Sequence, residues 1–133
     1  MKTYKFRIYP TKTQKKVISN QLEICRQVYN KTLEYKINKY KEDKSSVSLY
    51  DLHKLLTIWK KENLEYKQVY SQVLQSVQER LDLAFKAFFK RLKSCKSGFP
   101  RFKGFGRLRS LTYKQSGFKV TNELKLSKSL FML

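Results

Sequence analysis

The first residues of the chain alternate between apolar and basic side chains with a period of two. Apolar side chains occupy positions 4, 6 and 8, whereas Lys5 and Arg7 fall on the opposite face of an extended segment. This period is typical of a half-buried β-strand. Because proline lacks the N–H group that a strand ladder needs, we expect the strand over residues 2–9 to end at Pro10.

Between this strand and residue 92, apolar side chains recur every three or four residues, which is the period of an α-helix. Polar side chains that can cap a free backbone N–H precede two of these stretches. The pattern predicts three helices: a long one that Thr11 or Thr13 caps and that ends near Tyr40, a short one from Ser48 to about Lys61, and a third from Tyr66 to Leu92.

After the third helix, glycine and proline end the helical period at Gly98 and Pro100. Short apolar stretches then predict strands at Ser110–Lys114, Phe118–Val120 and around Leu124–Leu126. The predicted fold class is therefore α+β and mainly α, with a three-helix lobe between one N-terminal strand and two or three C-terminal strands.

Charge adds a functional expectation to this outline. The 133 residues include 30 Lys and Arg against 10 Asp and Glu, so the formal net charge is +20. Residues 1–16 carry +6, residues 17–85 carry +2 and residues 86–133 carry +12. Such an excess indicates a polyanionic partner, with nucleic acid first and an anionic membrane surface second. We expect both basic ends to meet on one small sheet; the alternative is that their charge is scattered over the surface.

Residues 98–109, GFPRFKGFGRLR, combine basic, aromatic and glycine residues more densely than any other segment. Basic side chains neutralise phosphates, and aromatic rings can stack on unpaired bases. This composition favours a nucleic-acid-binding loop. The alternative is a basic loop whose Phe side chains are simply packed under the helices.

Candidates for catalysis and for metal binding are scarce. Metal-dependent cleavage of a phosphodiester needs two or three convergent carboxylates, and no such pattern is visible. Cys25, Cys95 and the single His53 are too few for a structural zinc site, and we interpret His53 as a partly exposed helical residue. We therefore expect no cofactor, no metal site and no enzymatic activity in this chain. With no run of about 18 apolar residues and no signal-peptide pattern, a cytoplasmic location without membrane insertion is expected.

Four segments follow one another in a familiar order: Tyr4-Lys5-Phe6-Arg7-Ile8-Tyr9-Pro10-Thr11, Cys25-Arg26-Gln27-Val28-Tyr29-Asn30, Ala84-Phe85-Lys86-Ala87-Phe88-Phe89-Lys90 and Gly98-Phe99-Pro100-Arg101-Phe102-Lys103. In this order and spacing they resemble the N-terminal region of the TnpB family, the OrfB-type proteins of bacterial and archaeal insertion sequences. Family members resemble RNA-guided DNA endonucleases, in which a small β-barrel (the wedge) and a helical recognition lobe precede a nuclease domain and a zinc ribbon.

The resemblance implies a division of the chain into three parts. Residues 1–10 would form the first strand of the wedge barrel, residues 11–97 the helical recognition lobe, and residues 98–133 a basic loop with the returning strands of a partial barrel. The nuclease domain and the zinc ribbon would be absent. Guide RNA and double-stranded DNA are the implied partners, and the chain would bind them without cleavage. The alternative is a freestanding helix-turn-helix regulator, which predicts a dimer with regular half-site spacing.

The resemblance also suggests individual binding residues. Leu74-Gln75-Ser76 matches a family segment whose Gln reads the short motif beside the target, and Gln suits adenine; the alternative is a Gln that faces solvent. The basic segment after the third helix matches a segment expected to hold the RNA or DNA backbone. The full set of predicted nucleic-acid-binding residues is Lys5, Arg7, Lys12, Gln75, Arg101, Lys103, Arg107, Arg109, Tyr113 and Lys114.

Overall fold

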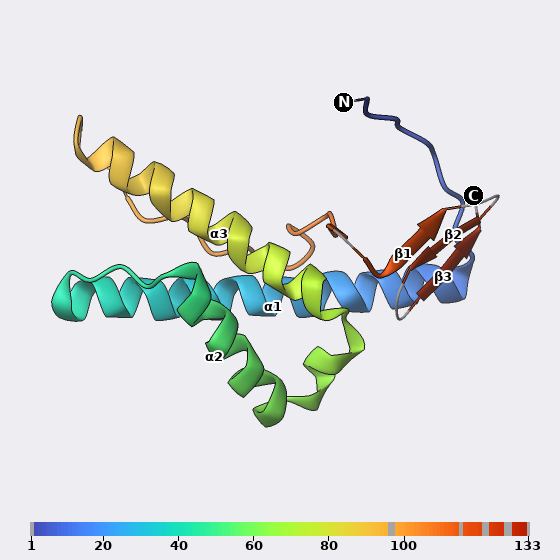
Figure 1. Cartoon of the computed structure of the whole chain (residues 1–133), viewed down its shortest axis with the longest axis horizontal. Helices are drawn as coiled ribbons and strands as arrows, with labels where there is room; N and C mark the ends of the chain where they lie inside the picture. Colours follow the sequence, from blue (N-terminus) through green and yellow to red (C-terminus); the bar gives the residue numbers. More distant parts are fainter. Residues whose placement is uncertain (1, 96–97, 115, 121–122, 127–128, 133) are drawn as a thin grey trace.

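Three helices dominate the computed structural model, which describes residues 2–95, 98–114, 116–120, 123–126 and 129–132. They are α1 (Lys12–Asp43), α2 (Leu49–Glu62) and α3 (Ser71–Leu92), and a short 3₁₀ helix, η1 (Leu64–Gln68), precedes α3. Figure 1 shows α1 as a long axis that α3 crosses, whereas α2 is directed away from it. The prediction of a mainly helical chain with three helices is confirmed.

Helix α1 begins at a capping box. The Thr11 hydroxyl accepts a hydrogen bond from the N–H of Gln14 at 3.3 Å, and the Gln14 side chain accepts one from the N–H of Thr11 at 2.8 Å. These bonds satisfy backbone donors that the first turn of a helix leaves free. Of the two predicted caps, Thr11 and not Thr13 therefore fixes the start of α1.

The third predicted helix begins later than its apolar period suggested. Tyr66 and Val69 are buried as a helical face requires, but they belong to η1 and to the link that follows it. The side chain of Asn63 accepts a hydrogen bond from the N–H of Glu65 at 3.1 Å, which favours a tight turn. Tyr70 then has ψ of 136°, which is outside the helical region, so α3 starts only at Ser71.

Apolar stripes on α1 and α3 pack against each other and form the core. Leu33 of α1 and Leu81 of α3 are fully buried, and Leu56 and Trp59 of α2 close the same cluster. Full burial of one such leucine stabilises the folded state by about 1.5–3 kcal/mol. The core therefore fixes how the three helices sit together.

A buried ion pair links α1 to α3 inside this core. The Nζ atom of Lys36, which is only 3% exposed, lies 3.1 Å from a carboxylate oxygen of Asp82 and 3.4 Å from the carbonyl oxygen of Val47. Nearby, the buried side chain of Gln78 donates to the carbonyl of Leu52 at 3.0 Å, and a ring nitrogen of His53 lies 2.9 Å from its oxygen. These polar contacts fix the helices in one register, and His53 is half-buried as part of them.

Three short strands, β1 (Phe118–Val120), β2 (Glu123–Leu126) and β3 (Ser129–Met132), form an antiparallel sheet in the order β1-β2-β3. Strand β3 contacts α1, and Figure 1 shows the sheet beside the N-terminal part of that helix. The strand predicted at Ser110–Lys114 is wrong. Arg80 of α3 instead donates to the carbonyl of Ser110 at 3.2 Å and to the hydroxyl of Thr112 at 2.8 Å, so side chains hold this stretch.

The predicted N-terminal strand is wrong as well. Residues 2–11 adopt no regular strand, and Tyr4 and Phe6 are 72% and 76% exposed. A strand needs a neighbour to complete its hydrogen bonds, and the described strands pair only with one another. Alternation therefore marks an extended segment here, and within the described residues no barrel is formed.

Candidate nucleic-acid interface

The basic stretch from Gly98 to Lys114, here called the return segment, runs back along α1 after α3 has ended. Its centre is held by one side chain of α1. Asn30 accepts a hydrogen bond from the N–H of Lys103 at 2.8 Å and donates one to the carbonyl oxygen of the same residue at 2.8 Å. Both polar groups of one backbone unit are thus bound to one amide, which fixes the segment on the helix.

Arg26, one helical turn earlier, adds to this clamp. Its guanidinium donates to the carbonyl of Lys103 at 3.1 Å and forms a two-pronged ion pair with Glu23. The hydrogen bonds of this pair lower the pKa of Glu23 and raise the pKa of Arg26. The Lys103 ammonium lies 5.2 Å from the centre of the Tyr29 ring, a cation–π contact that places this charge against α1.

The three Phe residues of the return segment have different environments. Phe99 packs on Phe88, with ring centres 4.9 Å apart, and on Phe85 and Tyr40. Phe102 and Phe105 are instead 55% and 85% exposed. Both interpretations of this loop therefore apply, because Phe99 is packed under the helices whereas Phe102 and Phe105 remain open to a ligand.

The basic residues of the return segment differ in the same way. Arg101 and Arg107 are exposed, and Arg109 is exposed although its Nε donates to the carbonyl of Gly106 at 3.3 Å. Lys114 forms an ion pair with Glu79 of α3, so its charge is partly compensated. Tyr113 is half-buried with its ring stacked on that of Tyr70, at 5.9 Å between centres, so it serves packing.

Gln75 lies beside Lys114, which is another of the predicted binding residues. The two residues line a small cavity of 130 Å³ together with Gln72 and Glu79. Gln75 is half-buried on α3, and the side chains around it are polar. The structure therefore brings together two of the predicted binding residues at this point on the surface.

The N-terminal basic residues Lys5, Arg7 and Lys12 lie elsewhere. All three are exposed, and the guanidinium of Arg7 lies 5.4 Å from the centre of the Tyr9 ring. From Lys12 to Asn30, where Lys103 is bound, α1 extends roughly 27 Å at about 1.5 Å per residue. The prediction that both basic ends meet on one sheet is wrong, because residues 2–11 pair with none of the described strands. The centre of the return segment also lies away from these residues, along the middle of α1.

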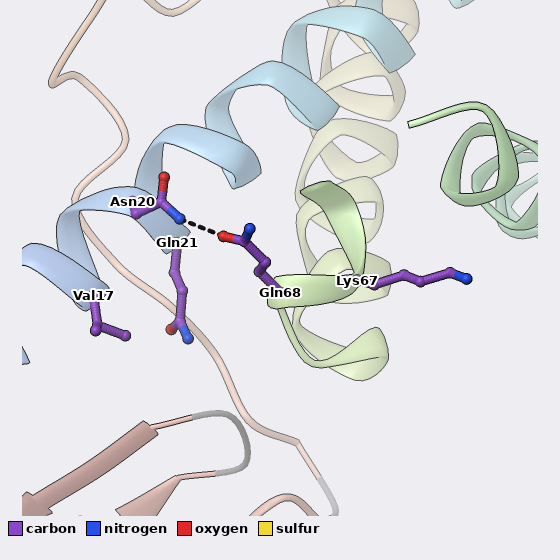
Figure 2. Close-up of a pocket in the computed structure, with 5 residues that line it drawn as sticks. All are labelled: Val17, Asn20, Gln21, Lys67 and Gln68. Atoms are coloured by element: carbon purple, nitrogen blue, oxygen red, sulfur yellow. Dashed lines mark hydrogen bonds between the residues drawn. The ribbon is translucent and has the colours of Figure 1, made fainter. Parts of the chain in front are cut away.

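Sequence reasoning missed a cavity between α1 and η1. Figure 2 shows it with Asn20 directed at Gln68, whose side-chain oxygen accepts a 2.6 Å hydrogen bond from the Asn20 amide. The cavity measures 450 Å³, and its lining residues are Val17, Asn20, Gln21, Lys67 and Gln68. Its two walls are far apart in sequence, and no motif in either one indicates a site.

Sequence reasoning also gave no role to Asn30 and Arg26, although a signal was present. Both belong to the segment Cys25–Asn30, one of the four on which the family resemblance rests. The structure joins this segment to another of the four, because Lys103 ends Gly98–Lys103. Phe85 and Phe88, which contact Phe99, belong to a third.

Within the residues described, no group of three or more His, Cys, Asp or Glu side chains is placed to hold a metal ion. No helix in the same part of the chain is both long and apolar enough to cross a membrane.

Comparisons with known proteins agree with the resemblance found in the sequence. The OrfB_IS605 family model, described as "Helix-turn-helix domain", matches residues 1–45. A protein from Streptomyces pristinaespiralis named "Putative RNA-guided DNA endonuclease" is 34% identical over 132 residues, which is 96% of this chain and 32% of that protein. The chain thus spans about a third of the length of this relative.

The matched range contains an extended segment and the single helix α1, so residues 1–45 hold no helix-turn-helix within the described structure. The match nevertheless begins with Tyr4–Thr11 and includes Cys25–Asn30, two of the four segments named above. Together with the relative, the match supports a TnpB/OrfB-type N-terminal region in this chain.

Proposed function

We propose that this chain binds nucleic acid and forms the binding part of an RNA-guided DNA endonuclease of the TnpB/OrfB type, without cleaving DNA itself. The name of the relative supports RNA and DNA as ligands. In this proposal the RNA is a guide RNA and the DNA is double-stranded. In such systems base pairing reads the target sequence, whereas the protein holds the backbone and reads a short adjacent motif.

The observation that carries the proposal is the return segment. Residues 98–114 contain five basic residues and no acidic residue. Arg101 and Arg107 project into solvent, while Asn30 and Arg26 hold the backbone between them. A charged strip that is already ordered loses little conformational entropy when it binds a phosphate chain.

Gln75 supports the finer part of the proposal. We propose that the cavity that Gln75 shares with Lys114 receives the edge of a base pair in the target-adjacent motif. An amide can bind adenine through one donor and one acceptor, and the neighbouring lysine can bind the phosphate of the same nucleotide.

The wedge barrel is part of the same proposal. The exposed N-terminal segment keeps the alternation of a strand, and Figure 1 shows it at the same end of α1 as the sheet. We infer that in a longer protein this segment pairs with further strands, and that Lys5, Arg7 and Lys12 then border the ligand.

Salt-dependent binding tests the proposal. Fluorescence anisotropy would measure the affinity for a duplex DNA and a structured RNA over a salt series. The slope of log K against log salt is negative for a protein that binds phosphates. Removing the charges of Arg101 and Arg107 by substitution with Ala should make this slope less steep by about 1.8 for duplex DNA, because each phosphate contact contributes about 0.9 to its magnitude.

The matched control removes two charges from α2, at Lys54 and Lys61, which are both exposed. Equal losses of affinity in the two double variants would mean that net charge alone drives binding. That result would refute the return segment as the binding surface. Incubation of labelled DNA with Mg²⁺ should leave it intact. A dimer that prefers one duplex sequence strongly over others would favour the helix-turn-helix regulator instead.

A further inference from the structure

A tight turn in the return segment presents one Phe side chain to solvent. The N–H of Arg107 donates to the carbonyl of Gly104 at 3.1 Å, and Gly106 has φ of 72°, a left-handed conformation that favours glycine. Phe105 lies in this turn and is 85% exposed, more than any other large apolar side chain in the described residues.

The chain is held on both sides of this turn. Lys103 before it is clamped by Asn30, and Leu108 after it is buried in the core with 4% exposure. Phe105 is therefore exposed because the ordered backbone directs it outward. Leaving a phenyl ring in water forgoes the free energy of its burial. Because the backbone on both sides is fixed, this ring is held in place for contact with another molecule.

A cavity of 240 Å³ lies between this turn and α1. Leu22, Leu108 and Phe105 supply apolar walls, while Arg109 supplies a cation. Glu23 and Arg26 also line the cavity, but their charges compensate each other in an ion pair. Apolar walls beside a cation suit a flat heterocycle that is attached to a phosphate.

We propose that Phe105 is a stacking platform for one unpaired base of a bound nucleic acid, with the adjoining cavity receiving the base and Arg109 facing its phosphate. This inference rests on the proposed function and names the ligand at one point of its surface. An unpaired base fits because both of its faces are available, whereas the bases of a duplex are already stacked on one another.

The test compares Phe105→Ala with Phe102→Ala, a matched control that removes the other exposed Phe of the segment but leaves the cavity intact. Anisotropy would measure binding of a labelled single strand of about 12 nucleotides and of a duplex of equal length. F105A should weaken single-strand binding by roughly five- to 150-fold, the range expected for the loss of one stacked base.

Three further results are expected. F105A should leave duplex affinity unchanged, it should leave the salt slope of single-strand binding unchanged because no charge is lost, and Phe105→Tyr should restore binding because the ring is kept. A circular-dichroism spectrum equal to that of the unmodified chain would show that F105A is folded.

The inference is overturned if F105A binds the single strand as tightly as F102A does, or if it weakens duplex and single strand equally. It is also overturned if F105A loses affinity only for anionic vesicles, because the ring would then contact a membrane. Failure of the unmodified chain to bind either nucleic acid would instead refute the proposed function itself.

Discussion

The contact between Asn30 and Lys103 gives the sharpest prediction about how the interface is built. Asn30→Ala removes both 2.8 Å hydrogen bonds at once, and the N–H of Lys103 loses its acceptor. Each such bond contributes about 0.5–1.5 kcal/mol net, so the variant should lose about 1–3 kcal/mol of local stability. Because Arg26 still donates to the carbonyl of Lys103, we expect the return segment to open locally while the helices stay folded.

Hydrogen exchange at the Lys103 amide measures this opening directly. A loss of 1–3 kcal/mol corresponds to exchange roughly five- to 150-fold faster in N30A. Asn30→Asp should have a smaller effect on this amide, since a carboxylate keeps the acceptor and loses only the donor. Nucleic-acid affinity should fall in N30A as well, because the bound state must then order the segment.

Asn38→Ala is the matched control, because Asn38 is an exposed residue of the same helix. It makes the same change of side chain, including the gain in helix propensity, without touching the return segment. The clamp is refuted if the Lys103 amide of a folded N30A protein exchanges no faster than that of N38A. An equal change of the exchange rate of this amide in both variants would show that only helix propensity had changed.

Further predictions concern the core and one turn. Burial raises the pKa of Cys25 to about 12, so thiol titration at mildly basic pH should detect the exposed Cys95 quickly and Cys25 only after denaturation. Asp82→Asn should cost about 3–5 kcal/mol in urea denaturation because Lys36 stays buried, whereas K36M should cost less because Asp82 keeps an exposed lysine partner. Burial alone raises the pKa of Asp82, but its lysine hydrogen bonds outweigh burial and lower it, so the stability that this carboxylate contributes should be present above pH 3.8 and lost as the pH falls further below it. Gly117→Ala should lower the melting temperature, since φ is +86° and an added Cβ would lie 2.4 Å from a tyrosine ring.

The helices could be predicted because their signals are local. The apolar period and the caps at Thr11 and Ser48 act within one or two turns of chain, and α1 and α2 begin where these caps place them. The start of α3 could not be read in this way. There the apolar period continues through Tyr66, while the side chain of Asn63 bends the backbone into a 3₁₀ turn that leaves the same residues buried.

The N-terminal strand shows a different limit. Alternation states which side chains would share a face, but a strand also needs a hydrogen-bonded neighbour, and that neighbour is a property of the whole fold. With Tyr4 and Phe6 exposed, the segment keeps the pattern of a strand without a sheet in the described structure. The same reason explains why the two basic ends do not share a sheet, although the described strands lie at the same end of α1 as the N-terminal segment.

The candidate interface could be predicted only in part. Composition located the segment, but it could not tell which of its side chains are packed against the helices and which are exposed. Phe99 and Phe105 are equivalent in sequence terms, yet one contacts the core and the other is open to solvent. What separates them is the clamp at Lys103, which lies between the two and was invisible because Asn30 is 73 residues away. Once the backbone is fixed there, Phe99 reaches the rings of α3 and the turn after it carries Phe105 outward. The ability of this segment to bind a ligand therefore depends on a polar contact in the middle of α1. The loss of that contact should weaken the contributions of Arg101 and Phe105 to binding together.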